Sequence, residues 1–427
     1  MRFGILCVGS HGDIRPYVAL GVKLKEEGHD VCIASHKKAE ALCQKYGLDF
    51  ALVEGDLTEI GNAQKSPDIL NSKGFKKLTA LLFIMKLFKE TLQQQIESSF
   101  QASKDVDVLI YNPAAFAGPH LAEFYNIPSF RIALQPELRT KHHPSCIVPI
   151  PKFFGSFGNL LGHFISDQMF WQPIRAQINR WRKQKLKLRK MHFLGPTKDP
   201  VSREICNIVA FSPLLVARPS DWGPRIHMTG FCRLFDAQKW TPSENLRAFV
   251  ESSPPEIYIG FGSLSETCPK SVVETIVAVL KKRKIKAVIQ DSLPGIQEMQ
   301  LPDHILVINY APHDWLFSHV KAVVHHGGVG TTAAGLYAGK PTLVMPFLLD
   351  QFFWGKKVFE LEVGPRPLPI KQCSEELFES SLEKLFTSPA YQKNASEVMT
   401  NLLEEEEGVD AAYRILHQSL FSSKNHK

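Results

Sequence analysis

A glycine-rich segment flanked by histidines and threonines is the part of this sequence best suited to chemistry. It reads His325, His326, Gly327, Gly328, Val329, Gly330, Thr331 and Thr332. An apolar β-branched run precedes it at 322–324, and small residues suited to a helix follow at 333–336. Glycines at a strand-to-helix turn let backbone N–H groups close on a phosphate, and the helix dipole adds attraction for the anion. The segment therefore predicts a diphosphate-binding turn.

A polar pair, Asp350 and Gln351, follows one strand–turn–helix unit later. In a parallel sheet the carboxyl ends of neighbouring strands share one edge, so this pair could reach whatever is attached to the phosphate. Together the two segments predict a nucleotide-diphosphate site with a sugar-binding end.

Alternating strands and helices must hold these residues in place. In the first half we predict strands at 3–8, 30–35, 106–111 and 129–134, with helices at 16–27, 39–46 and 118–125. In the second half we predict strands at 256–261, 287–290, 305–309, 322–325 and 342–346, and a helix at 272–281. This alternation is typical of βαβ units and predicts an α/β fold with parallel sheets.

The length of 427 residues is too great for one ordinary core and predicts two Rossmann-like domains facing across a cleft. We expect an N-terminal domain at 1–225, a linker at 226–250 within a proline-rich stretch, and a C-terminal domain at 251–405 that carries the predicted nucleotide-diphosphate site. An amphipathic helix within 406–427 is expected to pack back toward the N-terminal domain. Two inserts, 76–101 and 144–194, interrupt the first half; each could be core or inter-domain packing, or an acceptor pocket or membrane-facing lip.

Composition favours a soluble globular protein, with 44% hydrophobic and 22% charged residues and a net charge of +7. Seven of the basic residues gather between 180 and 190, either as a solvated helix face or as a contact with anionic lipid. No recognised nucleic-acid module accompanies them. The eight cysteines form no Cys-x-x-Cys pair, and the first apolar run is too short for a signal peptide. We expect a cytoplasmic protein with reduced thiols, and leave open whether it touches a membrane surface.

Several segments together resemble the UDP-sugar-dependent glycosyltransferases of the GT-B fold, above all sterol glucosyltransferases and their bacterial relatives. The resemblance rests on segments 9–16, 310–317, 325–328 and 346–355. It implies that His326 contacts the diphosphate and that Asp350 and Gln351 bind sugar hydroxyls. It further implies that Ser263, Gly328, Gly330, Thr331 and Thr332 offer hydrogen-bond donors to the phosphates. It also implies that Pro312 and His313 belong to a uracil-recognition stretch. Tyr310 stands where many relatives have a stacking Trp, and it could instead be a core residue.

The acid–base residue is expected near the start of the chain. Transfer with inversion needs a base that takes the acceptor hydroxyl proton. Many relatives use a His backed by an Asp; here Asp13 and Asn112 hold the corresponding positions, and His11 stands where many carry Arg. We predict Asp13 as the base, alone or with His11, since residues two apart on extended backbone face the same way. The alternative is that Asp13 only caps the first helix.

No cofactor and no metal is expected, because the UDP-sugar is a co-substrate and no His or Cys cluster has metal-ligand spacing. The triplet Asp105-Val106-Asp107 begins a strand, the wrong end for a ligand site. The resemblance implies an inverting hexosyltransferase, with glucose as the family default, that acts on a lipid-like alcohol such as a sterol. Three readings stay open beside it: transfer to a soluble natural product, binding of a nucleotide sugar without chemistry, and, more distantly, epimerisation of a nucleotide sugar.

Overall fold

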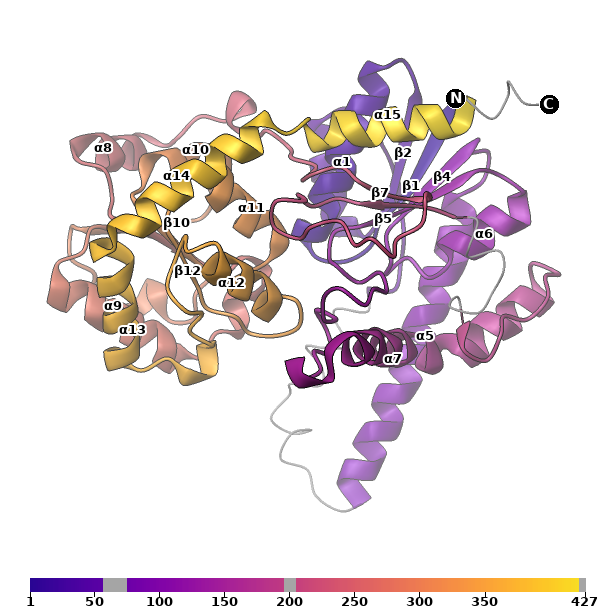
Figure 1. The fold of residues 1–427 in the computed structure, drawn as a ribbon, viewed down its shortest axis with the longest axis horizontal. Helices are drawn as coiled ribbons and strands as arrows, with labels where there is room; N and C mark the ends of the chain where they lie inside the picture. The colour runs from indigo at the N-terminus through magenta and orange to yellow at the C-terminus, as the bar shows by residue number, and fades with distance from the viewer. Residues whose placement is uncertain (57–74, 196–204, 422–427) are drawn as a thin grey trace. The chain divides into compact units, whose positions relative to one another are not determined.

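Two compact units make up the computed structural model, which describes residues 1–56, 75–195 and 205–421, with the backbone alone at 75–84 (Figure 1). The first unit comprises Met1–Pro213, Arg218–Arg233 and the residues from Glu407 onward. The second comprises Leu214–Ala217 and Leu234–Glu406. Each unit contains one parallel sheet, which confirms the predicted α/β class.

The first unit is built on a seven-stranded sheet with the order β3-β2-β1-β4-β5-β6-β7. Its strands are β1 (Arg2–Leu6), β2 (Asp30–Ser35), β3 (Asp49–Leu52), β4 (Val108–Tyr111), β5 (Ser129–Ala133), β6 (Cys206–Val209) and β7 (Ile226–Met228). In β1, Phe3 is in register with Val31 of β2 and Val108 of β4. The strand order reverses between β1 and β4, and at such a point the loops after the two strands diverge and leave room for a ligand.

Helices cover the strands of the first unit. They are α1 (His11–Glu26), α2 (Glu40–Lys45), α5 (Phe75–Ala102), α6 (Gly118–Tyr125), α7 (Gly155–Gln184) and α15 (Gly408–Phe421). The last of these lies against α1, where Lys23 forms an ion pair with Asp410 at 2.8 Å (Figure 1). Apolar side chains of α5, α6 and α7 form one core cluster with those of β1 and β4.

The second unit has a five-stranded sheet with the order β10-β9-β8-β11-β12. Its strands are β8 (Ile257–Gly260), β9 (Ala287–Gln290), β10 (Ile305–Ile308), β11 (Ala322–His325) and β12 (Thr342–Val344). Its helices are α8 (Glu244–Ser252), α9 (Lys270–Arg283), α10 (His313–Leu316), α11 (Val329–Tyr337), α12 (Gln351–Glu360), α13 (Glu375–Thr387) and α14 (Pro389–Glu404). Apolar side chains cover both faces of this sheet, since Ile257 and Ile259 belong to one core cluster and Tyr258 to another. Here the order reverses between β8 and β11.

The structure differs from the sequence expectations at the predicted linker and in the basic run. The segment 226–250, favoured as a linker, contains strand β7 and the start of α8, because its apolar residues pair with β6 and pack on the second sheet. The basic run at 180–190 is also not uniformly solvated. Arg182 is 1% exposed, and its guanidinium donates to both carboxylate oxygens of Glu123, at 2.7 and 3.1 Å. Arg182 is therefore a structural residue that joins α7 to α6, while Lys183, Lys185 and Lys187 are exposed.

Candidate functional site

The ring of His326 lies between two glycines at the point where the strand order of the second sheet reverses. Gly262 follows β8, and Gly328 caps the N-terminus of α11. A methyl group on Gly328 would overlap the ring at Nε2, and one on Gly262, whose φ is +56°, would lie 3.1 Å from Cε1. Both glycines are therefore needed to leave room for this imidazole.

The side chain of His326 is half-buried, and its imidazole is uncharged at neutral pH. Burial lowers its pKa from 6.5 to about 4. Its Nδ1 has no hydrogen-bond partner among the described residues, although nearly all buried polar atoms in proteins have one. A neutral imidazole with an unsatisfied nitrogen, beside the first turn of a helix, suits a polar ligand that reaches this turn.

His325 shapes the turn that carries His326. Its Nδ1 accepts a hydrogen bond from the backbone N–H of Gly327 at 2.9 Å. Gly327 has a φ of +91°, and a methyl group there would lie 2.7 Å from Cγ1 of Val344. The strand residue His325 is thus a positioning group, and only glycine fits at 327.

The first turn of α11 offers fewer side-chain donors than the sequence suggested. The Thr332 hydroxyl is buried and donates to the carbonyl oxygen of Gly328 at 2.9 Å, so its proton is committed within the helix. The Thr332 N–H donates to the same carbonyl oxygen at 2.9 Å, so neither the backbone nor the hydroxyl donor implied at this residue is directed to a phosphate. The Thr331 side chain is half-buried, and Gly330 is exposed with open space where a methyl group would lie. At this turn, anion binding therefore depends mainly on the backbone N–H groups and the helix dipole.

The turn after β8 is held by a residue that the sequence analysis did not single out. Gln290, the last residue of β9, accepts hydrogen bonds from the Gly262 N–H at 3.2 Å and the Ser265 hydroxyl at 3.1 Å. Ser263 lies exposed in the same short 3-10 segment, η6 (Gly262–Thr267). Gln290 could have been predicted as a site residue, because it is a polar residue at the carboxyl end of a strand next to the switch point.

Asp350 and Gln351 begin α12 and are both held by local contacts. The side-chain oxygen of Gln351 accepts from the N–H groups of Phe347 and Leu348 at 2.8 and 3.2 Å. The buried indole of Trp354 donates to Oδ2 of Asp350 at 3.2 Å. Leu349, just before the pair, has a φ of +54°, a left-handed conformation that is unfavourable for leucine and that concentrates at functional sites. The pair is thus fixed before any ligand binds.

The predicted uracil stretch surrounds the start of α10. Pro312 is the N-cap, and its carbonyl oxygen accepts from the Leu316 N–H at 2.8 Å. The ring of His313 stacks on Phe317, with centroids 4.5 Å apart. Tyr310 is 49% exposed, so the alternative of a core residue is wrong; its hydroxyl donates to Asp236 at 3.0 Å.

In the first unit, Asp13 lies inside the first turn of α1 and binds the residue that caps it. Its Oδ2 accepts from the Ser10 N–H at 2.8 Å and from the Ser10 hydroxyl at 2.7 Å. Gly9, with a φ of +135°, gives this carboxylate room. The helix starts at His11, so His11 and Asp13 are not on extended backbone, and residues two apart on a helix do not face each other. The expectation that they point the same way is wrong, although each can still act separately.

Asn112 does not support the acid–base pair. Its side chain is buried, donates to the Val8 carbonyl oxygen at 2.6 Å and accepts from the Val8 N–H at 3.3 Å. It therefore connects the loops that follow β1 and β4. The Asp105–Asp107 triplet lies at the amino ends of the strands of the first sheet, opposite the edge that carries Asn112. There Asp107 accepts a hydrogen bond from the Arg2 N–H at 2.7 Å.

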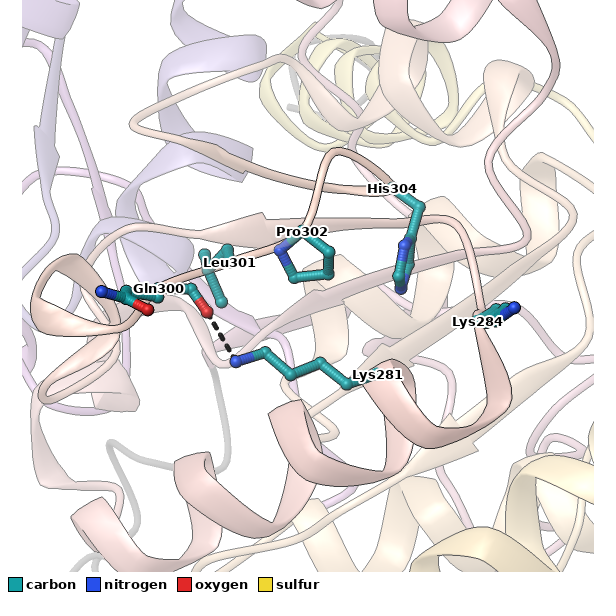
Figure 2. Close-up of a pocket in the computed structure, with 6 residues that line it drawn as sticks. All are labelled: Lys281, Lys284, Gln300, Leu301, Pro302 and His304. Atoms are coloured by element: carbon teal, nitrogen blue, oxygen red, sulfur yellow. Dashed lines mark hydrogen bonds between the residues drawn. The ribbon is translucent and has the colours of Figure 1, made fainter.

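The hollow drawn in Figure 2 is separate from these residues. It is lined by Lys281, Lys284 and His304, together with Gln300, Leu301 and Pro302 (Figure 2). Lys284 and His304 come just before β9 and β10, so the hollow opens at the amino ends of the strands. Ligands of parallel sheets bind at the carboxyl ends, so this hollow is not the candidate site.

Replacing His326 by Gln should make stability less sensitive to acid. Between pH 6.5 and about 4 the unfolded chain binds a proton at this histidine that the folded chain does not, so the folded state loses stability as the pH falls through this window. The loss amounts to about 3 kcal/mol. Urea unfolding at pH values above and below the window should show a smaller drop for His326→Gln than for the wild type. The exposed His192 gives the control variant His192→Gln, and equal drops in all three proteins would contradict the prediction.

Two protein-family models match parts of this chain. The family model described as glycosyltransferase family 28 N-terminal domain matches residues 3–144. The model described as erythromycin biosynthesis protein CIII-like, C-terminal domain, matches residues 272–415.

Curated relatives extend over nearly the whole chain. Sterol 3-beta-glucosyltransferase UGT80B1 of Arabidopsis thaliana is 33% identical over 432 residues, which cover 98% of this chain and 68% of that protein. The sterol 3-beta-glucosyltransferase of Aspergillus terreus is 34% identical and covers 99% of the chain, which in turn spans only 30% of the fungal protein.

Solved structures share the fold at low identity. The glycosyltransferase of kitacinnamycin superposes with a TM-score of 0.68 at 18% identity, covering 98% of each chain. SnogD from Streptomyces nogalater superposes with a TM-score of 0.67 at 17% identity, covering 98% of this chain and 99% of that one. These likenesses establish the two-sheet fold.

Proposed function

The chain belongs to the family 28 glycosyltransferases of the GT-B fold, and on this basis we propose that it transfers a hexose from a UDP-sugar to the hydroxyl of a lipid-like alcohol. A sterol is the foremost acceptor, since curated relatives at 33–34% identity are sterol 3-beta-glucosyltransferases. Glucose is the foremost sugar for the same reason.

The His326 turn is the observation that carries this proposal. It combines a half-buried neutral imidazole, a buried ring nitrogen without a hydrogen-bond partner and the start of α11 at the switch point of the second sheet. We assign the diphosphate to His326, the N–H groups of residues 328–331 and the turn at Ser263. Asp350 and Gln351 take the sugar hydroxyls, and Pro312 and His313 take the uracil. The fixed carboxylate of Asp350 supports hexose selection, since it need not be ordered when the sugar binds.

The reaction proposed is a single displacement at the anomeric carbon. The acceptor oxygen forms a bond to this carbon while the bond to the UDP oxygen breaks, and the acceptor proton passes to a base in the first unit. An α-linked donor then gives a β-glycoside. The negative charge that develops on UDP is met by the backbone N–H groups, the helix dipole and His326.

Asp13 is the proposed base. Its Oδ2 is oriented by Ser10, and a carboxylate oxygen has more than one lone-pair direction for a further proton. His11, exposed at the first position of α1, is the second candidate, and the changed geometry means that it would act in place of Asp13 rather than with it.

A donor and acceptor screen tests the proposal. The protein is incubated with UDP-glucose and other UDP-sugars, each with sterols, phenols or other alcohols, and the products are identified by mass spectrometry. We expect a sterol glycoside and UDP. Turnover of soluble phenols alone would replace the lipid acceptor by a soluble natural product. UDP-sugar binding without any transfer would overturn the proposed catalysis.

A further inference from the structure

Two exposed apolar side chains flank the proposed sugar-binding pair at the start of α12. Leu349, directly before Asp350, is 52% exposed, and Phe352, directly after Gln351, is 47% exposed. Large apolar side chains are also exposed elsewhere in the described part of the chain, and no helix there is long and apolar enough to cross a membrane. Leu349 and Phe352 differ from the others in their place, since an apolar group next to the bound sugar would lie beside both.

The backbone conformation of Leu349 makes its exposure unusual. Its φ of +54° lies in the left-handed region, where a Cβ atom approaches the following carbonyl oxygen and where glycine would fit without strain. The other non-glycine residues with positive φ in the described ranges are all polar or charged, namely Asp105, Asn126, Lys187, Lys284 and Glu362. A leucine here costs stability twice, because the backbone is strained and an apolar side chain stays in water. Such a residue indicates a ligand that covers it.

The segment around Leu349 is held firmly against the proposed diphosphate turn. The side-chain oxygen of Gln351 accepts from the N–H groups of Phe347 and Leu348, so the loop before Leu349 cannot shift without breaking these hydrogen bonds. A methyl group on Gly327 would lie 2.9 Å from the carbonyl oxygen of Gln351, so the start of α12 packs directly on the turn. Strand β12, which leads into α12, is the edge strand beside β11. The two apolar side chains therefore lie at the sugar end of the donor site.

We propose that Leu349 and Phe352 are the second unit's contribution to the acceptor site and that they select an apolar alcohol. The inference rests on the proposed glycosyl transfer. In that reaction the acceptor oxygen must reach the anomeric carbon of a sugar that Asp350 and Gln351 hold in the second unit. The carbon skeleton next to the acceptor hydroxyl must then lie beside this sugar, whichever residues of the first unit bind the rest of the molecule. An apolar skeleton there would remove both exposed side chains from water.

Acceptor kinetics test this assignment with variants that preserve the backbone. Leu349→Asn introduces a polar side chain of similar size that tolerates the left-handed conformation, and Phe352→Gln introduces a good helix former. The double variant should raise the KM for cholesterol at least about tenfold, because two apolar contacts are lost. The KM for cyclohexanol, which offers less apolar area, should rise less. Affinity for UDP, measured by calorimetry, should stay at the wild-type value, since UDP carries no sugar.

A glycine at position 349 separates contact with the acceptor from a role in the fold. Glycine adopts a positive φ without strain, so Leu349→Gly should melt no lower than the wild type and should still raise the KM for cholesterol. A leucine that served only the fold would give the opposite result, with a lower melting temperature and an unchanged KM.

Leu403 on α14, which is 57% exposed, provides the matched control, and Leu403→Ser should leave the KM for cholesterol unchanged. The inference is overturned if the double variant keeps the wild-type KM for cholesterol, if the KM rises equally for cholesterol and cyclohexanol, or if affinity for UDP falls as well. An unchanged KM with continued transfer to cholesterol would leave the proposed function intact. Binding of UDP-glucose without transfer to any alcohol would overturn the proposed function and this inference together.

Discussion

Replacing Asp13 by Asn should lower kcat by about 10²- to 10⁴-fold, the range associated with loss of a general base. The substitution removes the proton acceptor but keeps an oxygen that can still accept from the Ser10 N–H, so α1 should remain capped. Binding of UDP should not change, since the proposed donor residues belong to the second unit. Initial rates at saturating donor, with UDP titration calorimetry on the same protein, measure both quantities.

Two neighbouring substitutions provide the controls for Asp13. Ser10→Ala removes the hydroxyl that donates to Asp13 and should cost stability with little loss of rate. His11→Gln tests the second candidate base. If Asp13→Asn keeps its rate while His11→Gln loses most of it, the base is His11 and Asp13 is only a capping residue.

The second large effect is expected from Gly328→Ala. The added methyl group would overlap the His326 ring, and since a ring can rotate away more easily than backbone, the ring should be displaced while the fold survives. We expect a loss of at least about 100-fold in affinity for the UDP-sugar, on the scale of losing a well-placed donor to a developing charge. Calorimetric titration with UDP measures this loss, and thermal melting monitors the fold.

Gly223→Ala is the matched control, because a methyl group there meets no atom within 4 Å. It should leave UDP affinity unchanged. Undiminished affinity in Gly328→Ala would mean that the diphosphate does not depend on the position of His326, and the assignment of this turn would fail.

The regular elements could be predicted because their apolar patterns are strong and local. The strand at 30–35 and the helix at 118–125 have the predicted bounds, and those at 287–290 and 322–325 do as well. The predicted start of α1 at Pro16 is too late, since Ser10 caps the helix and Pro16 lies in its second turn. Strands β3, β6 and β7 are not among the predicted strands. The three residues of β7 are stabilised by pairing with β6, a long-range contact without a local signal.

The site could be predicted only as far as residue type and position in a turn determine it. The His326 turn after a strand follows from the sequence of glycines. The commitment of the Thr332 hydroxyl to Gly328 and the contact of Trp354 with Asp350 depend on side-chain rotamers, which a sequence pattern does not determine. The support of Gly262 by Gln290 depends on the pairing of β8 with β9.

The pairing of α15 with α1 has a consequence for synthesis. The ribosome makes α1 near the beginning and α15 after every element of the second unit, yet the two helices pack together in the first unit. The ion pair between Lys23 and Asp410 can therefore form only after the whole second sheet has been translated. The second unit can complete its core on the emerging chain, whereas the first acquires its last helix only afterwards, so a nascent chain arrested before Gly408 should expose the bare side of α1 to chaperones.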